Sequence, residues 1–208
     1  MTNPTFIGWT ALGSVAAWLL QFVFLGLMFS VATSPFGFLS DISYMLGALL
    51  TLPFMWAFYL LYRTEQGMVS TLALLLGILG VIVINVSQFR LITQQLSLEQ
   101  NMPQVALGTG LIGVSILLSN LLGKGNMQFP SSFTWLGIVV GGLMAMGILV
   151  ASFYGKEIFV MMSGSLDWSQ ANPFMLLVFA ATFLSQLGYP AWGIWLGQIL
   201  LRGKILIS

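Results

Sequence analysis

Residues 68–89 read MVSTLALLLGILGVIVINVSQF and include no Asp, Glu, Lys, Arg or His. An α-helix needs roughly 20 apolar residues to cross a hydrocarbon core of about 30 Å, so this stretch is long enough to span a bilayer. Its two amide side chains, Asn85 and Gln88, are neutral. Because a backbone in lipid must satisfy its polar groups internally, the stretch predicts a transmembrane α-helix.

Five further runs are also apolar and long enough to cross a bilayer. The chain is 58% hydrophobic and 5% charged, with a mean hydropathy of +0.99, whereas about 25% of the residues of a soluble domain are charged. The sequence therefore predicts an all-α protein, an integral membrane helical bundle with six transmembrane helices that forms a single membrane domain over residues 1–208. The predicted spans cover residues 8–31, 42–62, 68–89, 105–122, 135–154 and 174–201.

The composition narrows the chemistry available to this chain. His and Cys are both absent, which excludes His-ligated haem, thiolate and imidazole metal sites, disulfides and the His of a catalytic triad. We therefore expect no cofactor, no metal and no enzymatic activity. Six basic and five acidic residues give a net charge of +1 without a basic cluster, so nucleic acid is not an expected partner.

Short polar stretches separate the predicted spans. The connection at 63–67 is so tight that the second and third spans are expected to be antiparallel neighbours. Asp41 is predicted to cap the second span, Pro103 to restart a helix before the fourth, and Asn172 to cap the sixth. The longest connection, 155–172, is predicted to lie at the membrane interface.

Lys and Arg predict the orientation, because they are enriched in cytoplasmic connections. With a cytoplasmic N-terminus, four basic residues are inside (Arg63, Lys124, Arg202 and Lys204) and two are outside (Arg90 and Lys156). Both termini are therefore predicted to be cytoplasmic. Tryptophans are expected near the span ends as an aromatic belt; they are Trp9, Trp56, Trp135, Trp168, Trp192 and Trp195.

Amide side chains inside the spans are the candidate functional groups. Asn85 and Gln88 are three residues apart and share a helix face, where they would line a polar cavity together with Asn120 of the next span. The alternative is that these amides form hydrogen bonds that hold the helices together. An ion-coupled site normally uses a buried carboxylate or His, and the predicted spans contain neither. The whole set is Gln21, Asn85, Gln88, Asn120 and Gln186.

Two glycine pairs have the small-xxx-small spacing that lets helix backbones approach closely. These are Gly137 with Gly141 and Gly193 with Gly197. Two uses stay open for such a face: packing within one subunit, and contact with a partner helix or a second copy of the chain.

Two stretches carry a resemblance to known sequences. One is MLGALL at 45–50 followed by Pro53, YLLYR at 59–63 and GILG at 77–80; the other is YPAWGIWLGQILLR at 189–202. Together they resemble a family of small six-span bacterial membrane proteins of unknown function. The resemblance implies six spans and a bacterial inner membrane, and it brings no catalytic residues.

The leading hypothesis is a non-catalytic structural or accessory membrane protein. Its expected partners are the lipid bilayer and other membrane subunits or a second copy of itself, reached through helix packing. The alternative is a transporter, a channel or a lipid-binding protein for a neutral or apolar small molecule, which would use the amide set. An intramembrane enzyme comes third.

Overall fold

The computed structural model describes residues 3–31, 33–124, 129–154 and 172–203. Helices account for 90% of the structure and the described residues include no strand, which confirms the all-α prediction. The elements are α1 (Pro4–Ser30), α2 (Thr33–Leu49), α3 (Leu52–Ile92), α4 (Leu98–Leu122), α5 (Ser131–Ala145), α6 (Gly147–Leu149), a π-helix η1 (Val150–Tyr154) and α8 (Pro173–Leu201).

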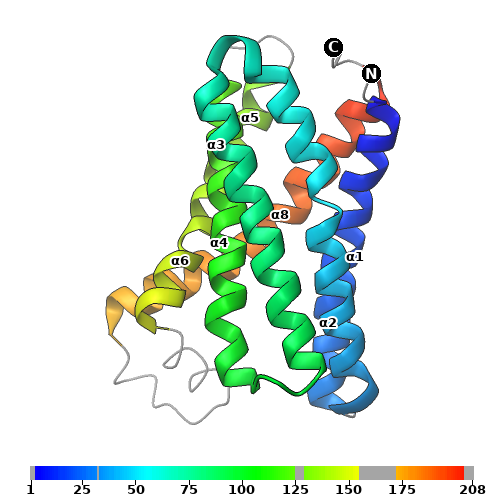
Figure 1. The fold of residues 1–208 in the computed structure, drawn as a ribbon, viewed down its shortest axis with the longest axis vertical. Helices are drawn as coiled ribbons and strands as arrows, with labels where there is room; N and C mark the ends of the chain where they lie inside the picture. Colours follow the sequence, from blue (N-terminus) through cyan, green and yellow to red (C-terminus); the bar gives the residue numbers. More distant parts are fainter. Residues whose placement is uncertain (1–2, 32, 125–128, 155–171, 204–208) are drawn as a thin grey trace.

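Five helical segments are long and apolar enough to cross a membrane, rather than the six predicted. The difference lies in one segment of 58 residues, Pro35–Ile92, which covers the predicted second and third spans together. The polar stretch at 63–67 was expected to be a connection, yet only Gln66 leaves the helical conformation there, with φ −138° and ψ 53°. Figure 1 shows α3 reversing direction at this point.

Prolines explain where α2 and α3 differ from the prediction. Pro35 lies in the first turn of α2, where a missing N–H costs nothing, so the helix begins at Thr33. Asp41 consequently lies about two turns inside α2, and the prediction that it caps a helix was wrong. The helix is instead interrupted between Leu49 and Leu52, because Pro53 cannot donate a backbone N–H to the preceding turn.

Side-chain caps start three of the helices. Asn3 caps α1, and Asn172 accepts a hydrogen bond from the backbone N–H of Phe174, which confirms the predicted start of the last span. Helix α4 begins with a capping box between Ser97 and Gln100. Pro103 therefore lies inside α4 and does not start it.

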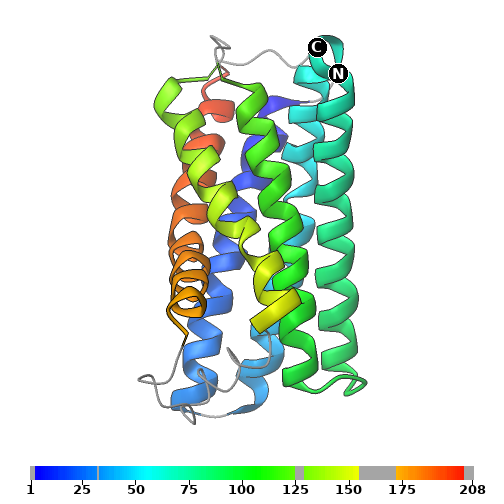
Figure 2. The ribbon, with the colours of Figure 1, turned by 90° about the vertical axis from the view of Figure 1, so that its left-hand side faces the viewer.

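The helices pack side by side into a closed bundle (Figures 1 and 2). Helix α1 contacts α2 and α8, α4 lies against α3 and α5, and α5 contacts α8. The beginning of α1 and the end of α8 are at the same end of the bundle (Figure 1). The first and last helices therefore close the ring against each other.

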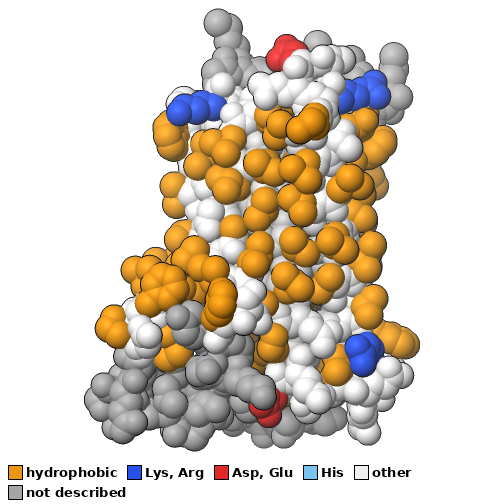
Figure 3. Space-filling view, turned by 60° about the vertical axis from the view of Figure 1, so that its left-hand side comes forward, with side chains coloured by type: hydrophobic (Ala, Val, Ile, Leu, Met, Phe, Trp, Pro, Cys, Tyr) orange, Lys and Arg blue, Asp and Glu red, His pale blue; other side chains and the backbone are white. Residues whose placement is uncertain are grey.

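Glycines allow several of these helices to approach at backbone distance. A Cβ added to Gly80 would lie 2.6 Å from the carbonyl oxygen of Gly108, and one added to Gly141 would lie 2.8 Å from that of Gly113. These contacts join α3 to α4 and α4 to α5. Figure 3 shows the complementary outer surface, where hydrophobic side chains cover the flank and charged ones appear towards the two ends.

The tryptophans divide between the surface and the core. Trp9, Trp56 and Trp135 are 63%, 46% and 50% exposed, as an aromatic belt requires. Trp192 is fully buried, so its assignment to that belt was wrong. Its ring stacks on Phe133 inside the bundle, where burial of a large aromatic surface outweighs the cost of an indole N–H without a partner. Trp168 lies outside the described residues.

Candidate functional site

The predicted amides do not gather at one place. Gln88 accepts a hydrogen bond of 3.2 Å from Asn101 on α4, and both side chains are buried. Asn85 donates to the carbonyl of Val81, and Asn120 donates to that of Ile116, each within its own helix. Asn101 was missed, because it was expected to lie in a connection.

The register of α3 against α4 separates Asn85 from Asn120. Gly80 meets Gly108 and Gln88 meets Asn101, so Asn85 lies between these two levels. Asn120 lies more than three turns of α4 beyond Gly108, against Gly137 of α5. Since the two helices are antiparallel, the two asparagines are at different depths and line no common surface.

The remaining predicted residues have mixed environments. Gln186 is partly buried on α8, and Gln21 on α1 has a buried side-chain oxygen without a hydrogen-bond partner. The four glycines of the small-xxx-small pairs all face other helices of the same chain. Gly137 lies against Asn120, Gly141 against Leu117, Gly193 against Val15 and Gly197 against Leu12.

A set of hydroxyl hydrogen bonds that the sequence did not predict joins four helices in the middle of the bundle. Ser14 of α1 donates to the carbonyl of Gly47 on α2 at 2.9 Å, and the hydroxyl of Tyr189 on α8 lies 2.6 Å from Oγ of Ser14. Because Ser14 donates its one proton to Gly47, Tyr189 is the donor in the second bond. Tyr44 of α2 bonds Thr109 of α4 at 2.5 Å.

Trp18 lies between the two tyrosines of this set. Its ring centroid is 5.0 Å from that of Tyr44 and 5.0 Å from that of Tyr189, and the rings are tilted by 50° and 45°. We call Ser14, Trp18, Tyr44, Thr109 and Tyr189 the central cluster. Each member is at least 96% buried. Hydroxyls scattered through apolar runs are common, and no spacing in the sequence marks these as partners.

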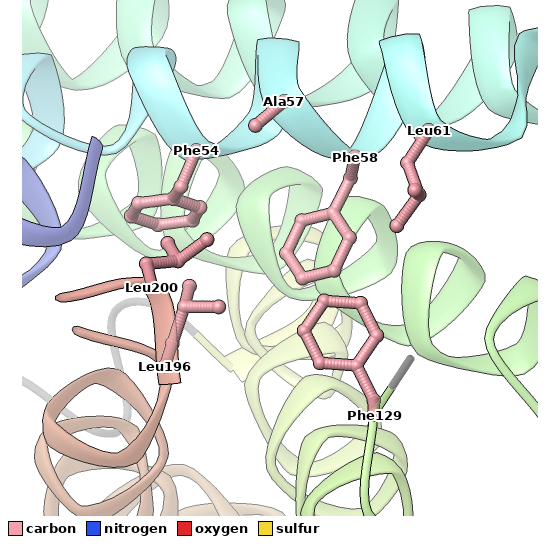
Figure 4. Close-up of a pocket in the computed structure, with 7 residues that line it drawn as sticks. All are labelled: Phe54, Ala57, Phe58, Leu61, Phe129, Leu196 and Leu200. Atoms are coloured by element: carbon pink, nitrogen blue, oxygen red, sulfur yellow. The ribbon is translucent and has the colours of Figure 1, made fainter. Parts of the chain in front are cut away.

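An apolar cavity lies between α3, α8 and the start of α5 (Figure 4). Its volume is about 10 Å³, roughly the space that one water molecule needs. Phe58 and Phe129 face each other across it, and α8 contributes Leu196 and Leu200. Its lining is entirely apolar and includes no predicted amide, so this cavity is not a continuation of a polar pathway.

The side chains available in the interior decide what chemistry it can support. Among residues 3–31, 33–124, 129–154 and 172–203, no group of three acidic residues is placed to hold a metal ion, and the sequence has no His or Cys. The hydroxyls of the central cluster are paired with one another or with backbone, which suits helix association better than nucleophilic attack. Comparison with protein-family models, with curated proteins and with solved structures finds no match to this chain.

Proposed function

We propose that this chain is a non-catalytic integral membrane protein, a structural or accessory subunit that associates through helix packing with itself or with a larger membrane complex. The observation that carries the proposal is the central cluster. Its hydroxyls bond to one another and to the backbone carbonyl of Gly47, and they hold α1, α2, α4 and α8 together. Side chains engaged in this way support helix association, and they are not free for substrate.

The faces that would contact a partner are the outer ones, since the predicted glycine pairs pack inside the bundle. Gly26 on α1 and Gly142 on α5 have no atom within 4 Å of an added Cβ. A larger side chain at either position would point outwards and leave the internal packing intact. Exposed Phe22, Val23 and Phe29 lie on the same helix as Gly26, which makes α1 the first outer face to test.

Six crossings with both termini cytoplasmic, in a bacterial inner membrane, complete the proposal. The reversal at Gln66 supports a count of six, because α2 and the first part of α3 together make one crossing before this residue and the rest of α3 makes another after it. In addition, α1 begins at the same end of the bundle at which α8 ends (Figure 1). The four-to-two distribution of Lys and Arg favours that end as the cytoplasmic one, and the resemblance to small six-span bacterial proteins favours the membrane.

Reporter fusions test this topology. Fusions at the C-terminus and next to Gln66 should report the cytoplasm, whereas a fusion at Gln95 should report the opposite side. A C-terminus on the side opposite to the Gln66 fusion would exclude six crossings.

Purification in mild detergent tests the function. The wild-type chain should elute as a complex larger than one subunit in its detergent micelle, with the same partner chain or copy recovered in each preparation. Gly26→Leu should reduce the size of that complex without changing thermal stability, and Gly142→Leu is the matched control on another helix. A wild-type chain that is monomeric, with nothing bound, would refute the accessory role.

A transporter, a channel or a lipid-binding protein for a neutral or apolar small molecule is the second candidate. The apolar lining of the cavity in Figure 4 favours it, because Phe54, Phe58 and Phe129 would suit an acyl chain after a modest rearrangement. Native mass spectrometry separates the two candidates. A lipid that stays bound to the wild type and is lost in Ala57→Phe, which fills the cavity, would favour the second.

A further inference from the structure

Lys124 and Trp135 form a cation–π contact between the end of α4 and the first turns of α5. The ammonium nitrogen of Lys124, just past the end of α4, lies 4.7 Å from the ring centroid of Trp135. Both residues are exposed, and Trp135 is 50% exposed. An ammonium group has three N–H donors, and a ring face restricts its position while N–H groups that point away from the ring stay free. The contact therefore presents an oriented positive charge on the outside of the bundle.

The contact is at one end of the bundle, where lipid headgroups would lie. Helix α4 ends and α5 begins at the end at which α1 begins and α8 ends (Figures 1 and 2). Trp9, near the start of α1, is exposed at the same end. Tryptophan and lysine side chains are typical of the membrane–water interface. The ammonium of Lys124 is therefore placed at the level of the lipid phosphates.

An apolar surface continues from this contact towards the middle of the bundle. Val139 and Gly142 follow Trp135 at spacings of four and three residues, so the three positions share one face of α5. Val139 is 53% exposed, and a Cβ added to Gly142 would have no atom within 4 Å. Leu121, three residues before Lys124, is 44% exposed. We call these five residues the α4–α5 patch. It is charged at its outer end and apolar over the next two turns.

The charges around the patch favour an anionic ligand. Within the described part of the chain, the ammonium of Lys124 has no acidic partner. The exposed charged residues described at this end of the bundle are Arg63, Lys124, Arg202 and the single acid Glu65. An anionic phospholipid complements both parts of the patch, because its phosphate oxygens accept hydrogen bonds from an ammonium group and its acyl chains cover apolar surface.

We propose that the α4–α5 patch binds one anionic phospholipid. The ammonium of Lys124 donates to the phosphate oxygens, and the ring of Trp135 holds the ammonium in position. One acyl chain lies on the apolar remainder of the patch. A zwitterionic lipid binds less tightly, because its own ammonium group already neutralises the phosphate. The site is on the outer surface, apart from the cavity in Figure 4, and it is independent of the accessory role proposed above.

Native mass spectrometry tests the site on the wild-type chain. The protein in detergent is titrated separately with phosphatidylglycerol and with phosphatidylcholine that carries the same acyl chains. We expect the first molecule of phosphatidylglycerol to bind about fivefold more tightly, the factor that one basic group contributes at an anionic surface. Equal binding of the two lipids would overturn the proposal, and this comparison needs no variant.

Variants at exposed positions locate the lipid. Lys124→Gln should remove the preference for phosphatidylglycerol. The matched control is Arg63→Gln, which removes an exposed charge at the same end from a residue without a ring contact in the described part of the chain, and it should keep the preference. Trp135→Leu should weaken binding by about threefold, because the ammonium is no longer held. Equal losses in Lys124→Gln and Arg63→Gln would indicate a general charge effect and overturn the site.

Ala57→Phe separates this site from the internal cavity. The substitution fills the cavity in Figure 4 and should leave the binding of phosphatidylglycerol unchanged. Loss of the lipid in Ala57→Phe but not in Lys124→Gln would place the lipid in the cavity and overturn the proposal. A wild-type monomer that binds phosphatidylglycerol through Lys124 would refute the accessory role and support this site, so the two proposals fail separately.

Discussion

The two sides of the bundle are held together in different ways. Helices α3, α4 and α5 approach through glycines, with Gly80 against Gly108 and Gly113 against α5. Helices α1, α2 and α8 are joined mainly by the hydroxyls and rings of the central cluster. In lipid the hydrophobic effect does not draw helices together, so close van der Waals packing and hydrogen bonds must do so. One small bundle therefore uses both devices in different proportions on its two sides, since Gly8 and Gly197 also bring α1 close to α8 and Gln88 bonds Asn101 between α3 and α4.

Gly113→Leu should have the largest effect. A Cβ at this position would lie 2.5 Å from Cβ of Met144 and 2.6 Å from the backbone nitrogen of Ala145, so α4 and α5 would have to separate. We expect a loss of about 3 kcal/mol or more, seen as a lower melting temperature in detergent. Gly142→Leu on α5, which faces open space, is the control and should melt like the wild type.

Gly197→Leu tests a glycine on the hydroxyl-bonded side. The nearest atoms to an added Cβ belong to the side chain of Leu12, at 2.7 Å, and the carbonyl of Gly8 is 3.2 Å away. A side chain yields more easily than a backbone, so we expect a smaller cost, about 1 to 3 kcal/mol in the same melting assay. A cost as large as that of Gly113→Leu would remove the contrast between the two sides.

Tyr189→Phe deletes one hydroxyl of the central cluster and keeps the ring. Ser14 retains its bond to Gly47, so no donor is left unsatisfied, and the loss should be about 1 kcal/mol. Tyr44→Phe should cost a similar amount. Chemical denaturation of the two single variants and the double variant would show whether the hydrogen bonds add; a loss below about 0.3 kcal/mol for each would mean that the rings alone hold this side.

Asn85→Leu should have the smallest effect. The amide bonds only the carbonyl of Val81 in its own helix, and that carbonyl belongs to the helix ladder in any case. We expect a change of less than about 1 kcal/mol and no loss of any uptake activity. A loss of uptake or ligand binding at unchanged stability would support the transport alternative.

The helices could be predicted from the sequence, but the residues at which they begin, end or change direction were harder to predict. Apolar runs such as 68–89 must be helical in lipid, because no water is present to satisfy the backbone. Whether Pro35 breaks a helix or begins one depends on its position in the turn, which the sequence does not reveal. The break at Gln66 is one residue long, shorter than the polar stretch that contains it. Asp41 was predicted to be a cap because the second span was predicted to begin at residue 42, after Pro35.

The interior contacts were the least predictable. Ser14 and Tyr189 are 175 residues apart, and no local pattern links them. Asn101 pairs with Gln88 although it follows a connection of polar residues that resembled a loop. Gly80 and Gly108 can be read from the sequence, but their positions along the chain do not show that the two contact each other. Such pairs come from tertiary register, which composition and periodicity leave open.

The bond between Ser14 and Tyr189 also sets an order for biosynthesis. Helix α1 leaves the ribosome before α8, but the hydroxyl and ring that complete its buried face belong to α8. Until the chain has been made past Tyr189, Trp18 faces lipid or a temporary neighbour in the insertion machinery. The bundle therefore closes only after its last described helix enters the membrane, and α1 and α8 made as separate fragments should each be degraded unless both are produced in the same cell.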